Sequence, residues 1–410
     1  MFASLANRNF RLYAAGQTAS AVGTWMQTVA QSWLVLVLTN SPGMVGLLVA
    51  VQMAPVLVFG PYAGAVADRA HKRRMIIVVQ AVMGGVALTL GVLTMTGAVT
   101  TWHVFVLAAL LGSTTAFDSP VRQAFIIEMV GREHLRNAMG LNLVVINVAR
   151  AVGPAVAGVV IATGGTGLCF VLNAASYLAV VVAMIRLDVS TLQPHEPAPR
   201  MRGQALDGVR YAWRTPQIRT PLLMMSAVGC FVFEYPVTLP VLATHDLHGG
   251  PDAYGFLTAA MGVGAIAGGL WSAARGSTGT PGLVKLLLGF AATLTAAALV
   301  PTLPVALVAI ALVGAWGTAS ITHGVGTVQL AAEPHMRGRV MAMWTVAFLG
   351  LTPLGGPLVG LVSARFGGRG GLLLGAATCV VVAVGGVVAV AHGRAAAIVP
   401  SVQHLSREEV

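Results

Sequence analysis

The chain is built from long apolar stretches, each of a length that can cross a lipid bilayer. A membrane-spanning helix needs about 20 apolar residues. In lipid a lone strand would leave its backbone groups without hydrogen-bond partners, so each stretch is predicted to be a helix. The sequence thus predicts an all-α membrane protein with twelve transmembrane helices. The apolar stretches run roughly over residues 10–38, 44–67, 75–96, 102–127, 138–163, 168–187, 218–243, 253–274, 282–301, 303–331, 339–363 and 370–391.

Composition excludes most other classes of protein. Of the 410 residues, 56% are hydrophobic and only 9% are charged, against roughly 25% charged residues in an average soluble domain. A soluble enzyme, a disordered scaffold and a disulfide-linked secreted module are therefore not expected. Cys169, Cys230 and Cys379 all lie within apolar stretches and lack metal-ligand spacing. No metal, cofactor or catalytic cluster is expected, and no G-x-x-x-x-G-K-S/T loop is present to bind ATP.

The basic residues predict the orientation in the membrane. An even number of spans puts both termini on one side. The loops and tails on that side hold nearly all of the 24 Lys and Arg residues, whereas the opposite loops hold only Arg365 and Arg369. Cytoplasmic loops are enriched in Lys and Arg. We therefore expect a multi-pass protein of the cell inner (plasma) membrane with both termini cytoplasmic, and the net charge of +11 needs no nucleic-acid partner.

An internal repeat divides the chain into halves. Gly153-Pro154 in the fifth span recurs as Gly356-Pro357 in the eleventh, and both pairs are expected to bend their helices. The sequence predicts two pseudo-symmetric six-helix bundles with a substrate site near the midplane between them, as in many transporters. The predicted divisions are a first bundle at 1–187, a cytoplasmic linker at 188–215, a second bundle at 216–394 and a cytoplasmic tail at 395–410.

The loop between the second and third spans carries the most specific motif. It reads Gly64-Ala-Val-Ala-Asp-Arg-Ala-His-Lys-Arg-Arg74. It resembles the G-x-x-x-D-R-x-G-R/K-R/K signature of the major facilitator superfamily, with His71 where glycine is usual. The resemblance implies a conformational gate, completed by a carboxylate at the inner end of the fourth span. The alternative is a topology signal joined to a turn. The residues of this expected gate are Gly64, Asp68, Arg69, Lys72, Arg73 and Glu128.

Several further segments resemble one branch of that superfamily, the enterobactin exporter and macrolide-efflux (drug:proton antiporter) branch. These segments are residues 20–26, 120–124, 130–135 and 254–255. The resemblance implies a secondary active transporter that exports a hydrophobic or amphipathic small molecule such as a drug or siderophore against protons by alternating access. We expect a monomer. The same-class alternative is uptake or facilitated diffusion, and the other-class alternative is a non-transporting membrane scaffold. A membrane-embedded enzyme is not expected.

Four ionisable residues inside the spans are candidates for proton coupling, because a charge within the bilayer is costly. Asp118 and Arg150 lie at similar depths in the fourth and fifth spans, so we expect them to pair, although Arg122 competes for Asp118 from one turn away. Glu234 has no basic partner in its own span and is the leading candidate, its alternative being a solvated vestibule residue. His323 is the fourth candidate, or else a hydrogen-bonded packing residue.

The first span carries a polar stripe at helical spacing. A stripe of uncharged hydrogen-bonding side chains can line a water-filled cavity, and the alternative is polar packing between helices. The fifth span adds two asparagines. The substrate-cavity candidates are Gln17, Thr24, Gln27, Gln31, Asn142 and Asn147.

Overall fold

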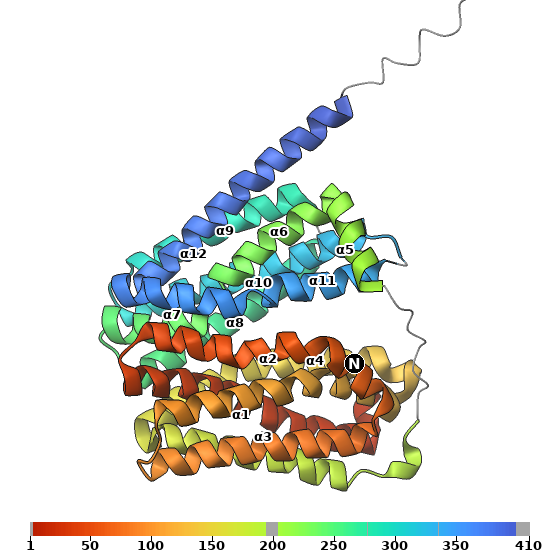
Figure 1. Cartoon of the computed structure of the whole chain (residues 1–410), viewed down its shortest axis with the longest axis vertical. Coiled ribbons are helices and arrows are strands. Elements are labelled where there is room, and N and C mark those ends of the chain that lie inside the picture. Colours follow the sequence, from red (N-terminus) through yellow and green to blue (C-terminus); the bar gives the residue numbers. More distant parts are fainter. Residues whose placement is uncertain (1–2, 194–203, 277, 335, 399–410) are drawn as a thin grey trace, which may run out of the picture.

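The structure is a computed structural model that describes residues 3–193, 204–276, 278–334 and 336–398. Within these ranges it is helical throughout, with no strand, and the helices form two side-by-side bundles (Figure 1). A short 3-10 helix, η1 (Ala3–Ala6), precedes the first long helix. The helices of the first bundle are α1 (Arg8–Thr39), α2 (Pro42–Arg69), α3 (Lys72–Met95) and the 85-residue α4 (Thr101–Ile185).

Helix α4 contains three membrane crossings rather than one. Its helical path is interrupted at Gly131 (φ 69°, ψ 177°) and at Gly165 (φ 79°, ψ 171°). Side chains other than glycine rarely adopt such positive φ values, so these two glycines allow the chain to turn back sharply. Short segments lie at the two ends of the predicted linker, η2 (Val189–Thr191) at its start and α5 (Gln204–Arg214) at its end.

The second bundle repeats this plan with more interruptions. Its last helix reverses direction at Gly367 (φ 70°, ψ −176°). The elements are α6 (Pro216–Phe231), α7 (Tyr235–Val241), the π-helical η3 (Leu242–Asp246), α8 (Pro251–Arg275), α9 (Thr280–Leu299), α10 (Leu303–Ala331), α11 (Arg337–Leu349) and α12 (Thr352–Ile398).

The number of crossings agrees with the sequence prediction. In the described part of the chain, ten helical stretches are long and apolar enough to span a membrane. Two of them have 53 and 55 residues, which at 1.5 Å per residue is roughly 80 Å, far more than the ~30 Å hydrocarbon core. Gly165 divides the first of these and Gly367 the second. The twelve-helix prediction is therefore confirmed.

Two crossings that the sequence predicts to be continuous are broken instead. The seventh is interrupted between Phe231 and Tyr235, and the eleventh between Leu349 and Thr352. A proline follows each break, Pro236 and Pro353, at the start of the next helix. Proline is tolerated in a first helical turn because its missing N–H would have no intrahelical partner there.

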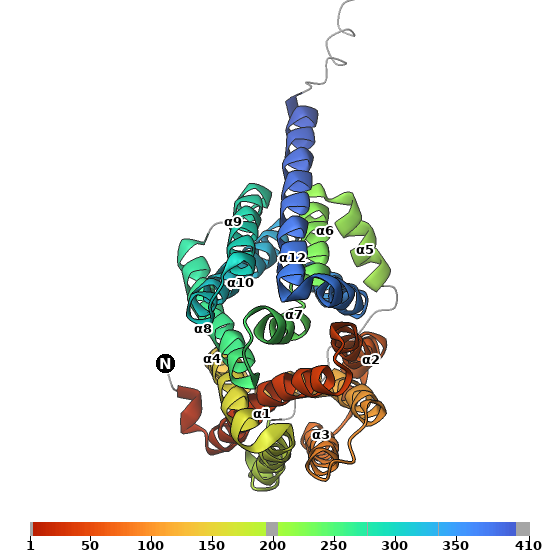
Figure 2. The ribbon, with the colours of Figure 1, turned by 90° about the vertical axis from the view of Figure 1, so that its left-hand side faces the viewer.

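Both bundles have the same two ends. One end carries His71, Gln193 and Gly276 and is called the linker end; the opposite, far end carries Asn40, Gly165 and Gly367. Figure 2 shows the molecule with the far end toward the viewer, and α7 lies between the two bundles there.

Close contacts between the bundles lie toward the far end, along α2–α12 and α4–α8. A Cβ added to Gly255 of α8 would lie 2.6 Å from Gly158 Cα of α4, and one added to Gly46 of α2 would collide with the carbonyl oxygen of Gly356 of α12. By contrast, a Cβ added to Gly60 of α2 or Gly140 of α4, nearer the linker end, would have nothing within 4 Å. We call the two lines of far-end contact the glycine seams.

Candidate functional site

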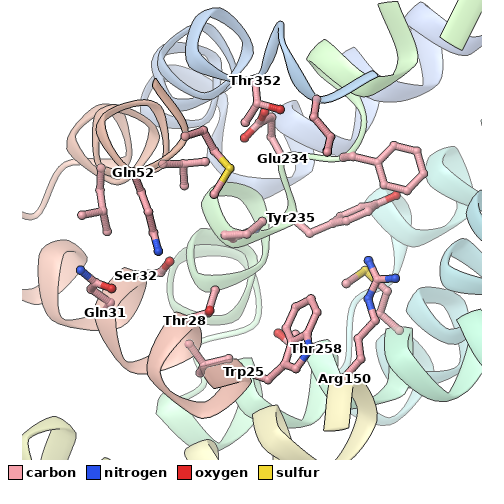
Figure 3. Close-up of a pocket in the computed structure, with 18 of the residues that line it drawn as sticks. Trp25, Thr28, Gln31, Ser32, Gln52, Arg150, Glu234, Tyr235, Thr258 and Thr352 are labelled. Atoms are coloured by element: carbon pink, nitrogen blue, oxygen red, sulfur yellow. The ribbon is translucent and has the colours of Figure 1, made fainter. Parts of the chain in front are cut away.

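A cavity of about 330 Å³ lies between the two bundles (Figure 3). Its volume falls within the usual range for small-molecule sites. The wall from the first bundle consists of residues of α1, α2 and α4: Trp25, Thr28, Val29, Gln31, Ser32, Leu48, Val49, Gln52, Met53 and Arg150. The wall from the second bundle consists of Gly229, Phe233, Glu234, Tyr235, Pro236, Tyr254, Thr258, Met261, Phe348, Leu349 and Thr352.

Both broken crossings contribute to this cavity. Phe233 and Glu234 belong to the break between α6 and α7, and Thr352 follows the break between α11 and α12. Non-helical backbone at membrane depth is tolerated where it lines a cavity or is buried in protein. Interrupted helices are also the usual place for binding sites in transporters. The breaks therefore mark this cavity as the candidate functional site.

Glu234 is the acidic group of the cavity. It caps α7 at its N-terminal end and is only 2% exposed. Its Oε1 has no hydrogen-bond partner among the described residues, and a Cβ added to Gly356 would lie 3.4 Å from its Oε2. Its neighbour in sequence, Phe233, packs against Phe348 with ring centroids 5.1 Å apart, and both rings line the same cavity. The carboxylate is thus held in an apolar setting next to a glycine seam.

Arg150 is the basic group of the cavity and comes from the opposite bundle. Its guanidinium carbon lies 5.2 Å from the ring centroid of Trp25 on α1, in a cation–π contact. In the described part of the chain it forms no ion pair. Figure 3 shows Arg150 and Glu234 on opposite sides of Tyr235. The cavity therefore contains one acidic and one basic side chain, contributed by different halves of the molecule.

The predicted pairing of Asp118 with Arg150 is wrong. Asp118 instead forms an ion pair with Arg122, one turn further along α4, and accepts a hydrogen bond from Gln80 Nε2 at 2.9 Å. The two residues that we expected to pair do lie at similar depths, but they face different surroundings: Asp118 faces the interior of the first bundle, whereas Arg150 faces the central cavity. Asp118 is accordingly remote from the candidate site.

The expected gate is only partly described by the structure. Lys72 Nζ lies 2.7 Å from Glu128 Oε1, joining the start of α3 to α4. Arg73 donates hydrogen bonds to the carbonyl oxygens of Met184, at 2.7 Å, and Ile185. Gly64, Asp68 and Arg69 lie in the last turns of α2, but what surrounds them is outside the described part of the structure. The role of all six residues stays a prediction.

The polar stripe of α1 divides between packing and the cavity. Gln31 lines the cavity. Gln17 and Gln27 are buried within the first bundle, where Gln27 Oε1 accepts a hydrogen bond from Asn173 at 2.6 Å. Thr24 donates to the Ser20 carbonyl oxygen. The two asparagines also lie outside the lining, and Asn147 donates to the Leu143 carbonyl oxygen of its own helix.

His323 lies far from the cavity. It is buried in α10, and its Nε2 is 2.9 Å from the Gly279 carbonyl oxygen at the linker end. This contact joins α10 to the residue that precedes α9. The surroundings of His323 thus agree with the alternative given for it, a hydrogen-bonded packing residue.

The two glycine–proline pairs lie at helix contacts. Gly153 lets α4 pack against α1: a Cβ added there would lie 2.6 Å from Trp25 Cβ. The Pro154 carbonyl oxygen would lie 2.6 Å from a Cβ added to Gly255 of the second bundle. Gly356 and Pro357 occupy the α12 side of the other seam, opposite Gly46.

Sequence reasoning did not single out several lining residues as site residues: Gln52, Tyr235, Tyr254, Thr258 and Thr352. One available signal was the proline after each broken crossing. Pro236 and Pro353 both interrupt apolar stretches, which is the pattern of discontinuous transmembrane helices.

Comparison with known proteins places the chain among transporters. A family model described as transmembrane secretion effector matches residues 1–410. The chain is 27% identical to the multidrug efflux pump Tap of Mycolicibacterium fortuitum, over 84% of this chain and 87% of that protein. It is 25% identical to the enterobactin exporter EntS of Shigella flexneri, over 89% and 90% of the two chains. A match to the staphyloferrin A transporter of Staphylococcus aureus, 26% identical, covers 60% of this chain and 62% of that protein.

Solved structures share the fold. A bacterial homologue of the human lysosomal transporter Spinster, in an inward-facing and unoccupied conformation, superposes with a TM-score of 0.71 at 16% identity, over 94% of this chain and 95% of that one. The nucleoside transporter NupG superposes with a TM-score of 0.72 at 12% identity, over 93% and 99% of the two chains.

Proposed function

Because the chain belongs to the transmembrane secretion effector family of the major facilitator superfamily, we propose that it exports an amphipathic small molecule in exchange for protons, by alternating access. The observation that carries this proposal is the central cavity, which is bounded by both bundles and contains a buried carboxylate with an unpartnered oxygen, Glu234 Oε1. A cavity between two bundles can open to either side as the bundles rock against each other.

The side from which substrate is taken follows from the charges of the loops. The linker end carries the basic residues, including Lys72 and Arg73, so it faces the cytoplasm of a cell membrane. The glycine seams hold the bundles together toward the far, outer end. We infer that this conformation has its outer side closed and receives substrate from the cytoplasm, as an exporter must.

The lining indicates the class of molecule. Aromatic and aliphatic side chains make up most of the cavity wall, with a small number of polar groups among them. Such a surface binds an apolar body and orients it through a few polar contacts. The names of the relatives, a multidrug efflux pump and two transporters of siderophore-type molecules, agree with an amphipathic organic substrate.

Glu234 is the group to which we assign proton coupling. A carboxylate at membrane depth can bind a proton when the cavity is open outward and release it when substrate arrives from the cytoplasm. The membrane potential can supply energy for this exchange, since one charge that crosses 100 mV contributes about 2.3 kcal/mol. His323 is not favoured, because it contacts the Gly279 carbonyl oxygen outside the cavity.

Purified protein in liposomes tests the proposal. An imposed pH gradient should drive accumulation of an amphipathic dye in the direction opposite to proton flow, and addition of the dye should produce a measurable proton flux. Accumulation in the same direction as the proton flow would indicate uptake by symport. A dye that moves without any proton flux would contradict the proposed coupling.

A further inference from the structure

Polar atoms from both bundles converge on the central cavity without partners. Glu234 Oε1, the Tyr235 hydroxyl and Gln31 Nε2 are all buried and make no hydrogen bond within the described structure. All three residues line the same cavity. Buried polar groups are nearly always hydrogen-bonded, so each exception calls for an explanation. Of the eleven such atoms in the described structure, these three belong to residues of one cavity, where a ligand can supply the missing partners.

The charges of the cavity are separated across it. Arg150 and Glu234 each lie roughly 25 Å from the linker end, counted at 1.5 Å per residue from Glu133 and Pro216, so they sit at about the same depth. One belongs to the first bundle and the other to the second, and Tyr235 lies between them (Figure 3). A molecule that touches both walls therefore meets a cation on one side and an anion on the other.

The surroundings of Arg150 leave its hydrogen-bonding edge available. Trp25 covers the guanidinium by its ring face, and no carboxylate among the described residues accepts its N–H groups. An aromatic face holds a guanidinium by its plane, while the planar fork of donors still fits a carboxylate or a similar acidic oxygen pair. Arg150 is thus positioned to bind an acidic group of a ligand.

Antiport adds a condition on the rest of the ligand. Substrate and proton must compete if one is to be exchanged for the other. Protonation of Glu234 removes a negative charge that repels an anionic ligand. A purely anionic ligand on Arg150 would therefore bind more tightly, and would not be displaced, when Glu234 takes up a proton. A ligand that also carries an amine competes with the proton directly, since both occupy the same carboxylate.

We propose that the substrate is an amphipathic zwitterion, whose acidic group binds Arg150, whose basic group binds Glu234, and whose apolar body packs against Trp25, Phe233 and Phe348. The proposal rests on the proposed function in one respect, namely that Glu234 exchanges a proton for substrate. The binding arrangement itself stands on the cavity geometry and is tested without any proton gradient.

Three dansyl compounds form a matched set of probes. Nα-dansyl-lysine is an amphipathic zwitterion whose carboxylate and amine lie at opposite ends of the lysine side chain, dansylcadaverine is the same molecule without the carboxylate, and dansylnorleucine is the same molecule without the amine. Each is titrated against the purified full-length chain in lipid nanodiscs at neutral pH and followed by dansyl fluorescence. The wild-type protein should bind the zwitterion at least ~10-fold more tightly than either singly charged compound, because each charge-assisted contact adds to affinity.

Two variants separate the two contacts. Arg150→Gln should remove the preference for the zwitterion over dansylcadaverine while keeping its preference over dansylnorleucine. Glu234→Gln should do the reverse. Arg150→Lys keeps the positive charge and should retain part of the preference, which shows that a lost preference is not simply lost folding. A monodisperse size-exclusion peak and unchanged binding of the compound whose contact is intact serve the same purpose.

Matched controls carry the same substitutions elsewhere. Arg275→Gln removes a guanidinium that also lies over a tryptophan, 4.4 Å from the Trp271 ring centroid, on the exposed surface of α8. Glu133→Gln removes an exposed carboxylate at the linker end. Both should leave the order of the three affinities unchanged.

The result can overturn the inference independently of the proposed function. Wild-type protein that binds none of the probes, or that binds the zwitterion no more tightly than the better singly charged compound, contradicts it. So does an unchanged preference in both Arg150→Gln and Glu234→Gln. If pH-driven export of dansylcadaverine occurs without a preference for the zwitterion, the inference fails and the proposed function stands. If the zwitterion is clearly preferred but no pH-driven transport occurs, the inference stands and the proposed function fails.

Discussion

Arg122 holds the carboxylate of Asp118 from one turn away on the same helix, and Gln80 of α3 donates a second contact at 2.9 Å. Both charged residues are largely buried in the first bundle and lie outside the lining of the central cavity. The ion pair thus lies within one crossing of α4, the Gln80 hydrogen bond joins it to α3, and neither contact links the two bundles. We propose that this cluster is structural, fixing α3 and α4 relative to each other at a depth where an isolated charge would be costly.

Neutralising Asp118 should destabilise the protein. Asp118→Asn leaves the Arg122 guanidinium buried without its counter-ion, and breaking a buried pair in this way typically costs about 3–5 kcal/mol. We expect a lower thermal unfolding midpoint for the purified protein in detergent. Combining Asp118→Asn with Arg122→Gln should recover part of the loss, whereas combining it with Arg150→Gln should give additive losses. Coupling between Asp118 and Arg150 in this cycle would contradict the structure.

Neutralising Glu234 should uncouple transport from protons. Glu234→Gln keeps the size of the side chain and cannot exchange a proton, so uphill transport driven by a pH gradient should fall to background. Exchange of substrate in the absence of a gradient should persist. Proteoliposome assays under the two conditions distinguish these outcomes, with Glu133→Gln as the control. Uphill transport at the wild-type rate by Glu234→Gln would exclude it as the coupling site.

Exchanging the charges of Lys72 and Glu128 tests the predicted gate. Their side chains lie 2.7 Å apart at the linker end. Glu128→Lys places two cations together and should strongly reduce transport while the protein stays in the membrane. The double variant Lys72→Glu/Glu128→Lys restores an attractive pair and should recover part of the activity. If the gate includes Asp68, Asp68→Asn should also abolish transport in well-expressed protein. Full activity of both Glu128→Lys and Asp68→Asn would contradict the gate.

A side chain at Gly46 should force the outer end open. A Cβ at this position would collide with the Gly356 carbonyl oxygen, so Gly46→Val prevents α2 and α12 from closing together. A cysteine introduced at Val49, which lines the cavity, should then react several-fold faster with a membrane-impermeant maleimide added outside. The native cysteines are buried and should react slowly. Gly85→Val is the control, because a Cβ there would have nothing within 4 Å. Equal labelling of both variants would count against a seam that closes the cavity.

The sequence predicted the crossings well because they depend on local composition. An apolar stretch of sufficient length has to be helical in lipid, and the turns between stretches are marked by glycines such as Gly165 and Gly367. The breaks before Tyr235 and Thr352 were not predicted, because their flanking residues are apolar too and hydropathy alone does not distinguish a bent crossing from a straight one.

Pairing across helices was harder to predict than depth. Counting residues gives the height of a side chain in the membrane, but the direction it faces depends on how each helix is rotated, which tertiary packing decides. Asp118 and Arg150 have similar heights and face different interiors for this reason. The stripe on α1 shows the same effect: Gln27 contacts Asn173 inside the bundle, while Gln31, one turn on, reaches the cavity.

The glycine seams and the cavity walls make opposite demands on mutation. At Gly46, Gly255 and Gly356 any side chain meets the backbone of the other bundle, so these positions admit no change without loss of closure. Cavity residues such as Val49 and Thr28 border open volume, where a change of shape alters what fits. Selection can therefore change the substrate of such a transporter through its cavity residues while the glycine seams, where the bundles close together, stay the same. A lineage that acquires resistance to a new compound is expected to carry its substitutions at cavity residues and to keep the glycine seams unaltered.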